Sequence, residues 1–419
     1  MGFQQGLSGL NGAAKNLDVI GNNIANASTV GFKASQTQFA DVYATSLYGA
    51  GGLTVGIGTK VSDVAQQFTQ GNVAVTNNPL DIAISGEGFF RMEQDGVITY
   101  SRNGQFNLDK DGFIINASNQ QLTGYLADSN GSIIGGGIPV PIQISLAPSP
   151  PQVTSEAELD LNLDSQETAI AAATLINPSD PDTYNHSTSF TVYDEAGNPH
   201  GMVLYFQKNA SNTWVADAYV NGTQVTIGAG GASGAGMTLG FNTDGSINTI
   251  NGAAASAQTL TIPAGTLGTG AAALVFDANF NGFTQYGSAF GVSFVSQDGY
   301  GSGRIAGVAV DREGVILGRY TNGQTRNLGQ VILHSFLNPQ GLQPIGNNQW
   351  FETAESGQAT YGAPGSGVLG YVQSGSIEES NVDMTAELVN LIVAQRMYQA
   401  NAQTIRAQDQ ILQTLVNLR

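Results

Sequence analysis

Few side chains of this 419-residue sequence stand at spacings that would let them perform chemistry together. The histidines His186, His200 and His334 are scattered without metal-ligand spacing, and His334 lies in an apolar run that predicts a core residue. Asp109 and Asp111 could belong to a calcium loop or an acid/base pair, but no suitably spaced glutamate completes the loop. An Asp-Gly hairpin turn explains these two residues more simply.

The remaining candidate motifs are incomplete as well. Gly56–Lys60 lacks the Gly-Lys-Ser/Thr order of a phosphate loop, and Gly301–Gly303 lacks the spacing of a dinucleotide-binding turn. The sequence has no cysteine, which excludes disulfides and thiolate chemistry, and no local motif suggests a Ser/His/Asp set. We therefore predict no catalytic residue, no metal site and no cofactor, and we expect the chain not to be an enzyme.

The composition narrows the classes of partner. Fourteen Lys and Arg against 32 Asp and Glu give a net charge of −18, so no basic face is available for nucleic acid or anionic lipid. No stretch approaches the roughly 20 apolar residues of a membrane span, and the start shows neither a basic nor an apolar signal region. We expect no membrane insertion and an export route without a cleaved signal peptide.

Both ends of the chain carry apolar residues at heptad spacing, which predicts two helices that meet other helices. The N-terminal stripe consists of Phe3, Leu7, Leu10, Ala14, Leu17 and Ile24. The C-terminal stripe consists of Leu391, Tyr398, Ile405 and Leu412, with Leu388, Ala402 and Val416 on a neighbouring line that Gln395 and Asp409 interrupt. Ser380 and Asp383 resemble a capping box, so the C-terminal helix is predicted to start near Asn381.

These two stripes have two interpretations. A helix packed on its own domain would explain either stripe alone. Matching stripes at both ends of one chain can instead pair with each other and leave a second face exposed for copies of the same protein. We favour this second interpretation and predict an assembly element.

Between the ends, the apolar period changes from helical to alternating, which predicts a β-rich body with frequent turns. Prolines from 139 to 151 mark a boundary near residue 148, and a Gly/Ala/Ser-rich stretch at 228–236 predicts an exposed loop or sheet edge. The predicted fold class is a mainly β body with α-helical termini, in which an outer β domain is inserted into an inner one. The expected boundaries are a helical assembly domain at 1–35 and 375–419, linkers at 36–70 and 363–374, an inner β domain at 71–147 and 283–362, and an outer β domain at 148–282.

Three stretches resemble one known family. The segment "LDVIGNNIANASTVGFKAS" (17–35) is similar to the N-terminal signature of bacterial flagellar rod and hook proteins, and the segment 377–419 is similar to their C-terminal signature. The segment "SGEGFFRMEQDGVITYSRNGQFNLDKDGFIINASNQQLTGY" (85–125) resembles their shared β domain. Because rod members lack a large inserted β domain, the middle of this chain resembles the hook members more closely.

The resemblance implies a structural subunit that polymerises into a curved hollow tube and passes motor torque from rod to filament. It implies terminal helices that line the tube, and a bend at Gly31, Phe32 and Lys33 that leads to the first β domain. It implies contacts with further copies of the chain, a distal rod protein, a hook cap, a hook–filament junction protein and the flagellar type III export apparatus. The expected location is the hook region of the basal body, outside the cell.

Other classes of protein remain as alternatives. The nearest is a distal rod protein with an unusual insertion. A secreted β-rich adhesin or glycan-binding protein would use exposed aromatic residues such as Trp214, although Trp214 alternates with apolar residues in a predicted strand and is expected in the core. A glycosidase with two carboxylates is the weakest alternative.

Overall fold

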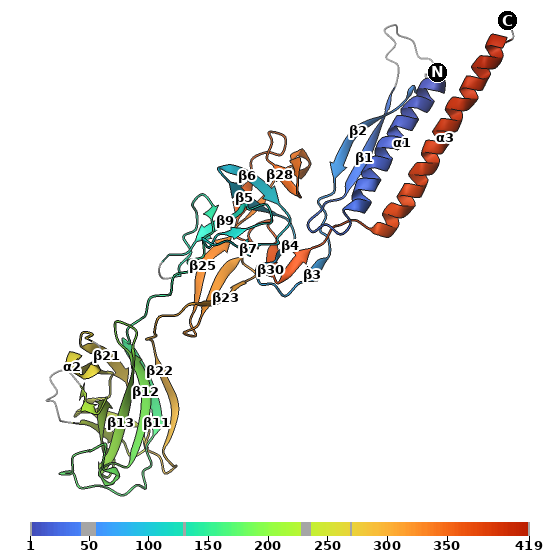
Figure 1. Cartoon of the computed structure of the whole chain (residues 1–419). Helices are drawn as coiled ribbons and strands as arrows, with labels where there is room; N and C mark the ends of the chain where they lie inside the picture. The colour runs from blue at the N-terminus through green and yellow to red at the C-terminus, as the bar shows by residue number, and fades with distance from the viewer. Residues whose placement is uncertain (1, 43–55, 129–130, 228–235, 269, 418–419) are drawn as a thin grey trace. The chain divides into compact units, whose positions relative to one another are not determined.

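The computed structural model describes residues 2–42, 56–128, 131–227, 236–268 and 270–417. The chain divides into two compact units: unit 1 comprises Met1–Leu146, Ala306–Arg319 and Thr325–Arg419, and unit 2 comprises Ala147–Ile305 and Tyr320–Gln324. Unit 1 holds the two long helices and one β body, and unit 2 is a second β body inserted into it (Figure 1). The predicted fold class is confirmed.

The terminal helical module consists of helices α1 (Gly2–Ala25) and α3 (Met384–Asn417) with strands β1 (Ser35–Val42) and β2 (Gly58–Gln66). The two helices lie side by side, and the antiparallel strand pair packs on α1 (Figure 1). The Gln5 side chain of α1 donates a hydrogen bond to the Gly56 carbonyl at 2.7 Å. Much of the segment 36–70, which was expected to be a linker, is thus a strand pair: β1 and β2 bond to each other and pack on α1.

Helix α3 starts three residues later than predicted. The Asp383 carboxylate accepts the backbone N–H groups of Thr385 and Ala386 at 2.8 and 3.1 Å, so Asp383 is the N-cap. The Ser380 hydroxyl accepts the N–H of Val382 at 3.3 Å in the turn before the helix. The capping-box prediction therefore placed the helix start too early. Ser and Asp are both favourable N-cap residues, and the local pattern does not decide which of Ser380 and Asp383 takes that position.

The β body of unit 1 is built around one large sheet. Its main path runs β23 (Ile305–Val310), β24 (Val315–Tyr320), β25 (Thr325–Val331), β9 (Gln121–Leu126), β5 (Phe89–Gln94), β6 (Val97–Ser101), β28 (Gln349–Phe351) and β27 (Gln343–Gly346). Short strands extend this path: β7 (Asn107–Leu108), β8 (Ile114–Ile115), β10 (Val140–Pro141), β26 (Leu333–Ser335) and β29 (Thr360–Gly362). A 3-10 helix spans Pro339–Gly341. The two halves of the chain therefore interleave in one sheet.

Two further antiparallel pairs bring the C-terminal part of the chain back to the N-terminal part. Strand β3 (Val73–Val75) pairs with β31 (Ser376–Glu378), and β4 (Ile82–Ser85) pairs with β30 (Tyr371–Ser374). Part of the segment 363–374, another expected linker, is thus a strand of the body. Strands β30 and β31 come shortly before α3 in the chain, so these pairs fix where α3 leaves the body.

The acidic residues considered above for a calcium loop or an acid/base pair lie in a turn. One Asp109 carboxylate oxygen accepts the N–H groups of Asp111 and Phe113 at 2.9 and 2.8 Å, and Gly112 has a φ of +85°. Asp311 repeats this arrangement by accepting the N–H of Val315 at 2.7 Å. The interpretation of Asp109 and Asp111 as residues of an Asp-Gly hairpin turn is confirmed.

Unit 2 is a two-sheet β structure. One sheet runs β16 (Thr226–Ile227), β20 (Gln258–Ile262), β21 (Leu274–Asn279), β11 (Glu156–Asn162) and β22 (Gly291–Gln297). The other runs β12 (His186–Tyr193), β13 (Pro199–Ala210), β14 (Thr213–Val220), β17 (Met237–Phe241), β18 (Ile247–Ile250) and β19 (Ala253–Ala254), with β15 (Thr223–Gln224) beside β14. Unit 2 also contains a 3-10 helix at Pro181–Thr183 and the short helix α2 (Ala264–Leu267). Because β22 pairs with β11, unit 2 extends to Ile305, beyond the expected boundary at 282.

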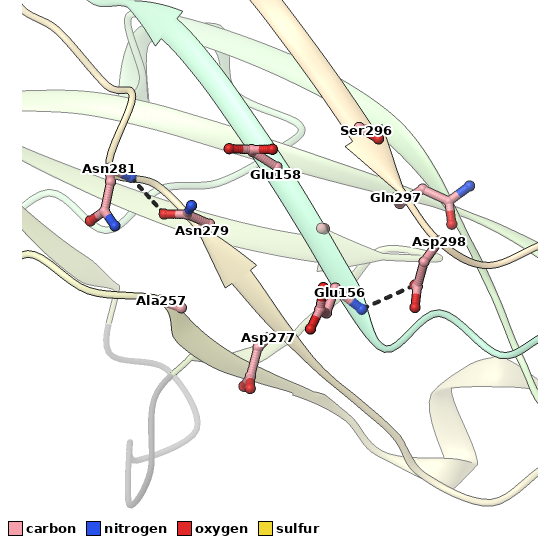
Figure 2. Close-up of a pocket in the computed structure, with 10 residues that line it drawn as sticks. Glu156, Glu158, Ala257, Asp277, Asn279, Asn281, Ser296, Gln297 and Asp298 are labelled. Carbon is pink, nitrogen blue, oxygen red and sulfur yellow. Dashed lines mark hydrogen bonds between the residues drawn. The ribbon is translucent and has the colours of Figure 1, made fainter.

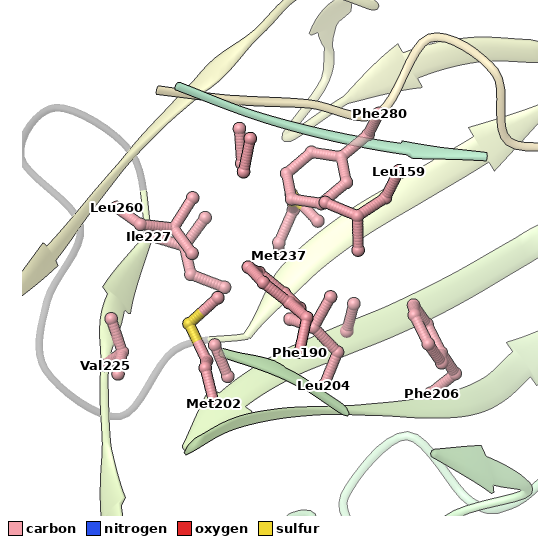
Figure 3. Close-up of a cluster of buried hydrophobic side chains, with 14 of the residues drawn as sticks. Leu159, Phe190, Met202, Leu204, Phe206, Val225, Ile227, Met237, Leu260 and Phe280 are labelled. Carbon is pink, nitrogen blue, oxygen red and sulfur yellow. The ribbon is translucent and has the colours of Figure 1, made fainter. Parts of the chain in front are cut away.

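Both sheets of unit 2 contribute to one apolar core. Leu159 and Leu260 come from the first sheet, and Leu204 and Met237 come from the second (Figure 3). Trp214 is fully buried in the same core, as its alternating pattern predicted. The stretch 228–235, expected to be a loop or sheet edge, lies outside the described residues.

Candidate assembly interface

The seam between α1 and α3 is made mostly of small and polar residues. A Cβ atom on Gly9 would lie 2.8 Å from the Asn401 side-chain oxygen, and one on Gly6 would lie 3.0 Å from Cγ1 of Ile405. Ala394 of α3 is buried. The helices therefore approach closely without a continuous row of large apolar side chains between them. Sequence analysis missed Gly6 and Gly9, although two glycines three residues apart in a predicted helix were a visible signal.

The line of α3 that faces α1 differs from the predicted one. Asn401 and Ala394 face the seam, whereas Leu388 on the predicted neighbouring line is exposed and Ala402 is half-buried. Ile405 of the main predicted stripe does lie against α1. The prediction preferred the more apolar of two adjacent lines, and tertiary packing selected the one with the smaller residues.

Most of the predicted stripe residues remain accessible. Phe3 and Leu7 are 47% and 44% exposed, and the other predicted residues of α1 are half-buried: Leu10, Ala14, Leu17 and Ile24. On α3, Leu388, Tyr398 and Leu412 are exposed and Leu391 is half-buried. The side chain of Val416 lies outside the described residues. The buried apolar residues of α1 are instead Val19 and Ile20.

The first half of α3 exposes large apolar side chains. Met384, Val389, Ile392, Val393 and Met397 are 42% to 57% exposed. Large apolar side chains exposed together on one helix mark a surface that other chains contact. The terminal helical module therefore presents far more apolar surface than one intrachain seam can bury.

The bend after α1 requires glycine at position 31. Gly31 has a φ of +72°, and a Cβ there would lie 2.7 Å from the backbone nitrogen of Asn103. Its N–H donates to the Glu378 carbonyl at 2.8 Å. Phe32 is half-buried, and its N–H donates to the Thr29 carbonyl at 3.2 Å. The predicted bend residues thus lie where the helix joins the β body.

Lys33, the third predicted bend residue, is a buried cation. Its Nζ lies 2.6 Å from a Glu378 carboxylate oxygen and donates to the Thr69 carbonyl at 2.8 Å. Arg102 binds the second carboxylate oxygen of Glu378 at 2.7 Å. Burial, the dominant influence, lowers the pKa of Lys33, while the Glu378 charge opposes that shift. Sequence analysis did not find Glu378 or Arg102, because their partners lie far away in the chain.

A polar groove of about 460 Å³ in unit 2 is the place where carboxylates gather (Figure 2). Glu156, Glu158, Asp277 and Asp298 line it, and one Asp298 oxygen accepts the N–H of Glu156 at 3.0 Å. Asp277 accepts the Thr259 hydroxyl at 2.7 Å. Within the described residues, no group of three or more His, Cys, Asp or Glu side chains could hold a metal ion.

The histidines are structural in the described structure. His334 is buried between the rings of Tyr100 and Tyr361, and burial together with the Arg91 charge lowers its pKa to about 3. The ring of His200 lies 3.1 Å from an Asp194 oxygen, and His186 stacks on Phe290. The prediction of His334 as a core residue is confirmed.

In the described part of the chain, no helix is long and apolar enough to cross a membrane.

Four family models match successive parts of the chain. They are "Flagella basal body rod protein" at residues 3–33, "Flagellar hook protein FlgE/F/G D1 domain" at 83–155, "Flagellar basal body protein FlaE D2 domain" at 162–300 and "Flagellar basal body rod FlgEFG protein C-terminal" at 373–418. The first and last models cover the terminal helices and the D2 model covers most of unit 2.

Whole-length relatives match as well. The chain is 42% identical to the flagellar hook protein FlgE of Salmonella typhimurium over 424 residues and to that of Escherichia coli over 422, with 100% of each chain covered. It is 32% identical to the FlgE of Borreliella burgdorferi over 440 residues, covering 99% of this chain and 98% of that one. The crystal structure of the Helicobacter pylori flagellar hook protein FlgE2 has a similar fold, with a TM-score of 0.50, 13% identity, and coverage of 73% and 99% of the two chains.

Proposed function

The chain belongs to the flagellar hook protein family, and from this premise we propose that copies of it polymerise into the curved hollow tube that passes motor torque from rod to filament. The observation that carries the proposal is the exposed apolar surface of α1 and α3. Head-to-tail contacts that do not close on themselves generate a helical filament, so one such surface can repeat along a tube. The role is structural, without catalysis or cofactor.

The terminal helices carry the contacts between copies in this proposal. Phe3, Leu7, Leu388, Tyr398 and Leu412 are exposed in the single chain and are the residues that neighbouring copies would cover. The other predicted stripe residues contribute from half-buried positions. Unit 2 would form the outer part of the tube, and the bend at Gly31, Phe32 and Lys33 would join the inner helices to the β body.

The remaining partners follow from the family. A hook subunit meets the distal rod protein at one end of the tube, and a cap and then a junction protein at the other end. The subunit reaches its place outside the cell through the flagellar type III export apparatus.

Removal of residues 412–419 tests the proposal. The deletion removes the exposed Leu412 and the residues after it and leaves both β bodies intact, so the variant is expected to fold and to fail to polymerise. Electron microscopy detects tubes, and circular dichroism detects the folded β bodies. Tubes formed by the truncated chain would contradict the assigned role of the terminal helices.

A further inference from the structure

Methionine side chains hold the only sulfur atoms of the chain, which has six methionines and no cysteine. Three of the methionines lie in the β bodies and are at most 1% exposed: Met92, Met202 and Met237. Met384 and Met397, in the first half of α3, are 42% and 57% exposed. Met1 lies outside the described residues. Among the methionines that the structure describes, a dissolved oxidant can therefore reach only Met384 and Met397 without unfolding the chain.

Each of these two methionines ends a row of exposed apolar side chains on α3. Residues four apart lie one turn above each other on a helix, so they form rows along it. One row, 42% to 51% exposed, consists of Met384, Leu388 and Ile392. The other row, 49% to 57% exposed, consists of Val389, Val393 and Met397. Because Val389 and Ile392 are three residues apart, the rows meet and form one apolar patch with a methionine at either end.

Oxygen transfer from hydrogen peroxide changes the character of such a patch. A lone pair of the thioether sulfur attacks one peroxide oxygen, the O–O bond breaks and an S–O bond forms. The proton of the transferred oxygen passes to the departing oxygen, which leaves as water, so the sulfur is oxidised by two electrons and the peroxide is reduced. The resulting sulfoxide is polar and chiral, whereas the thioether was apolar. Burial of the sulfoxide oxygen among aliphatic side chains without a hydrogen bond is unfavourable.

We propose that Met384 and Met397 form a peroxide-sensitive modification site, at which conversion to the sulfoxide prevents the free chain from joining the polymer. The inference rests on the proposed function, in which neighbouring copies cover α3. Two residues assigned to that contact are close by: Leu388 lies one turn from Met384, and Tyr398 follows Met397. Assembly buries the patch and protects both sulfur atoms from further oxidation. The modification is reversible, because methionine sulfoxide reductases restore the thioether.

Peptide mass spectrometry of the full-length chain tests the accessibility of the site. The free chain and assembled tubes are exposed to the same concentration of hydrogen peroxide for the same time. In the free chain, Met384 and Met397 are expected to be oxidised well before the three buried methionines. In tubes, oxidation of both residues is expected to be largely lost. Equal oxidation of buried and exposed methionines in the free chain, or equal oxidation of Met384 and Met397 in the free chain and in tubes, would overturn the inference.

Light scattering and electron microscopy then measure the concentration at which the free chain forms tubes. Peroxide treatment is expected to raise this concentration about tenfold or more, because each added copy has to bury an unpaired polar group. The matched variant is Met384→Leu/Met397→Leu, since leucine and methionine have similar volumes and leucine cannot be oxidised by peroxide. This variant should form tubes at the unaltered concentration, both before and after the treatment.

The remaining outcomes separate the modification from the polymer itself. Recovery of tubes after the oxidised chain is treated with methionine sulfoxide reductases would support the assignment. Tubes formed at the unaltered concentration by a chain that carries both sulfoxides would refute it. Inhibition that persists in Met384→Leu/Met397→Leu would also refute it, because this variant keeps every other methionine of the chain. If the untreated chain formed no tubes under any condition, the proposed function would fail instead.

Discussion

Lys33 and Glu378 form an ion pair with 2.6 Å between Nζ and Oε1, and both side chains are almost completely buried. Lys33 belongs to the bend after the N-terminal helix, whereas Glu378 belongs to β31, shortly before the C-terminal helix. The same Glu378 oxygen accepts the N–H of Gly71 at 2.9 Å, and Arg102 binds the other oxygen at 2.7 Å. One carboxylate thus holds both ends of the chain to the β body.

Replacement of Glu378 is expected to destabilise unit 1 strongly. Glu378→Ala leaves Lys33 and Arg102 buried without their anion, which typically costs about 3–5 kcal/mol. Each unit contains one of the two tryptophans, so the unfolding of each unit can be followed separately. Trp350 is buried in unit 1 and Trp214 is buried in unit 2. Denaturant unfolding followed by Trp350 fluorescence in a Trp214→Phe background measures the loss. Glu379→Ala, on the exposed neighbouring residue, is the control, and equal effects of the two variants would refute the argument.

Substitution of Gly31 is expected to disrupt the bend. In Gly31→Ala, the new Cβ meets the backbone of Asn103 at 2.7 Å in a left-handed conformation, so a loss of about 2 kcal/mol or more is expected. Gly21→Ala is the matched control. Gly21 lies within α1 with open space around its Cβ position, so alanine there should stabilise the helix by about 0.5–1 kcal/mol. Limited proteolysis of α1 and denaturant unfolding measure both effects, and a harmless Gly31→Ala would contradict this account.

Acid is expected to destabilise unit 1 through His334. Its pKa is about 3 in the folded protein and 6.5 when unperturbed, so the unfolded chain binds the proton more readily. The stabilisation is present above pH 6.5 and falls by about 1.4 kcal/mol per pH unit between pH 6.5 and 3. His334→Phe keeps a ring between Tyr100 and Tyr361 and should flatten this slope. The measurement is Trp350-monitored unfolding across that range, and an unchanged slope would exclude His334 as its source.

The stability of unit 2 should fall, rather than rise, as the pH increases through the pKa range of Asp217. Burial raises the pKa of this carboxyl from 3.8 to about 6, although a hydrogen bond from Gln224 opposes the shift. The folded state therefore binds the proton more readily, and the stability of unit 2 falls by about 2–3 kcal/mol as the pH rises from 3.8 through 6. Asp217→Asn should remove that decline in Trp214-monitored unfolding of a Trp350→Phe background. A decline that persists in Asp217→Asn would refute the assignment.

Local patterns were sufficient for several features of the chain. Apolar alternation predicted the β bodies, the turn at Asp109 followed from its Asp and Gly spacing, and the heptads predicted two terminal helices. Gly31 was predicted at a bend and adopts a positive φ there. Each of these features depends on residues within about one turn or one strand of each other, so the physical cause is contained in a short stretch of sequence.

Other features depended on partners that are distant in the chain. The strand pair of β1 and β2 was taken for a linker, but the two strands pair with each other and pack on α1. The end of unit 2 was misplaced because β22 finds its partner β11 across most of that unit. The capping residue of α3 was chosen wrongly between two good candidates, Ser380 and Asp383.

The sequence by itself therefore determined the kinds of element, their approximate order and the absence of cysteine chemistry, because composition and local periodicity govern these. Only the tertiary structure decided which line of α3 faces α1, which apolar residues of the helices stay exposed, and that Glu378 joins Lys33 to Arg102. These outcomes result from close packing and charge pairing between residues hundreds of positions apart, where the gain depends on the shape and distance of both partners.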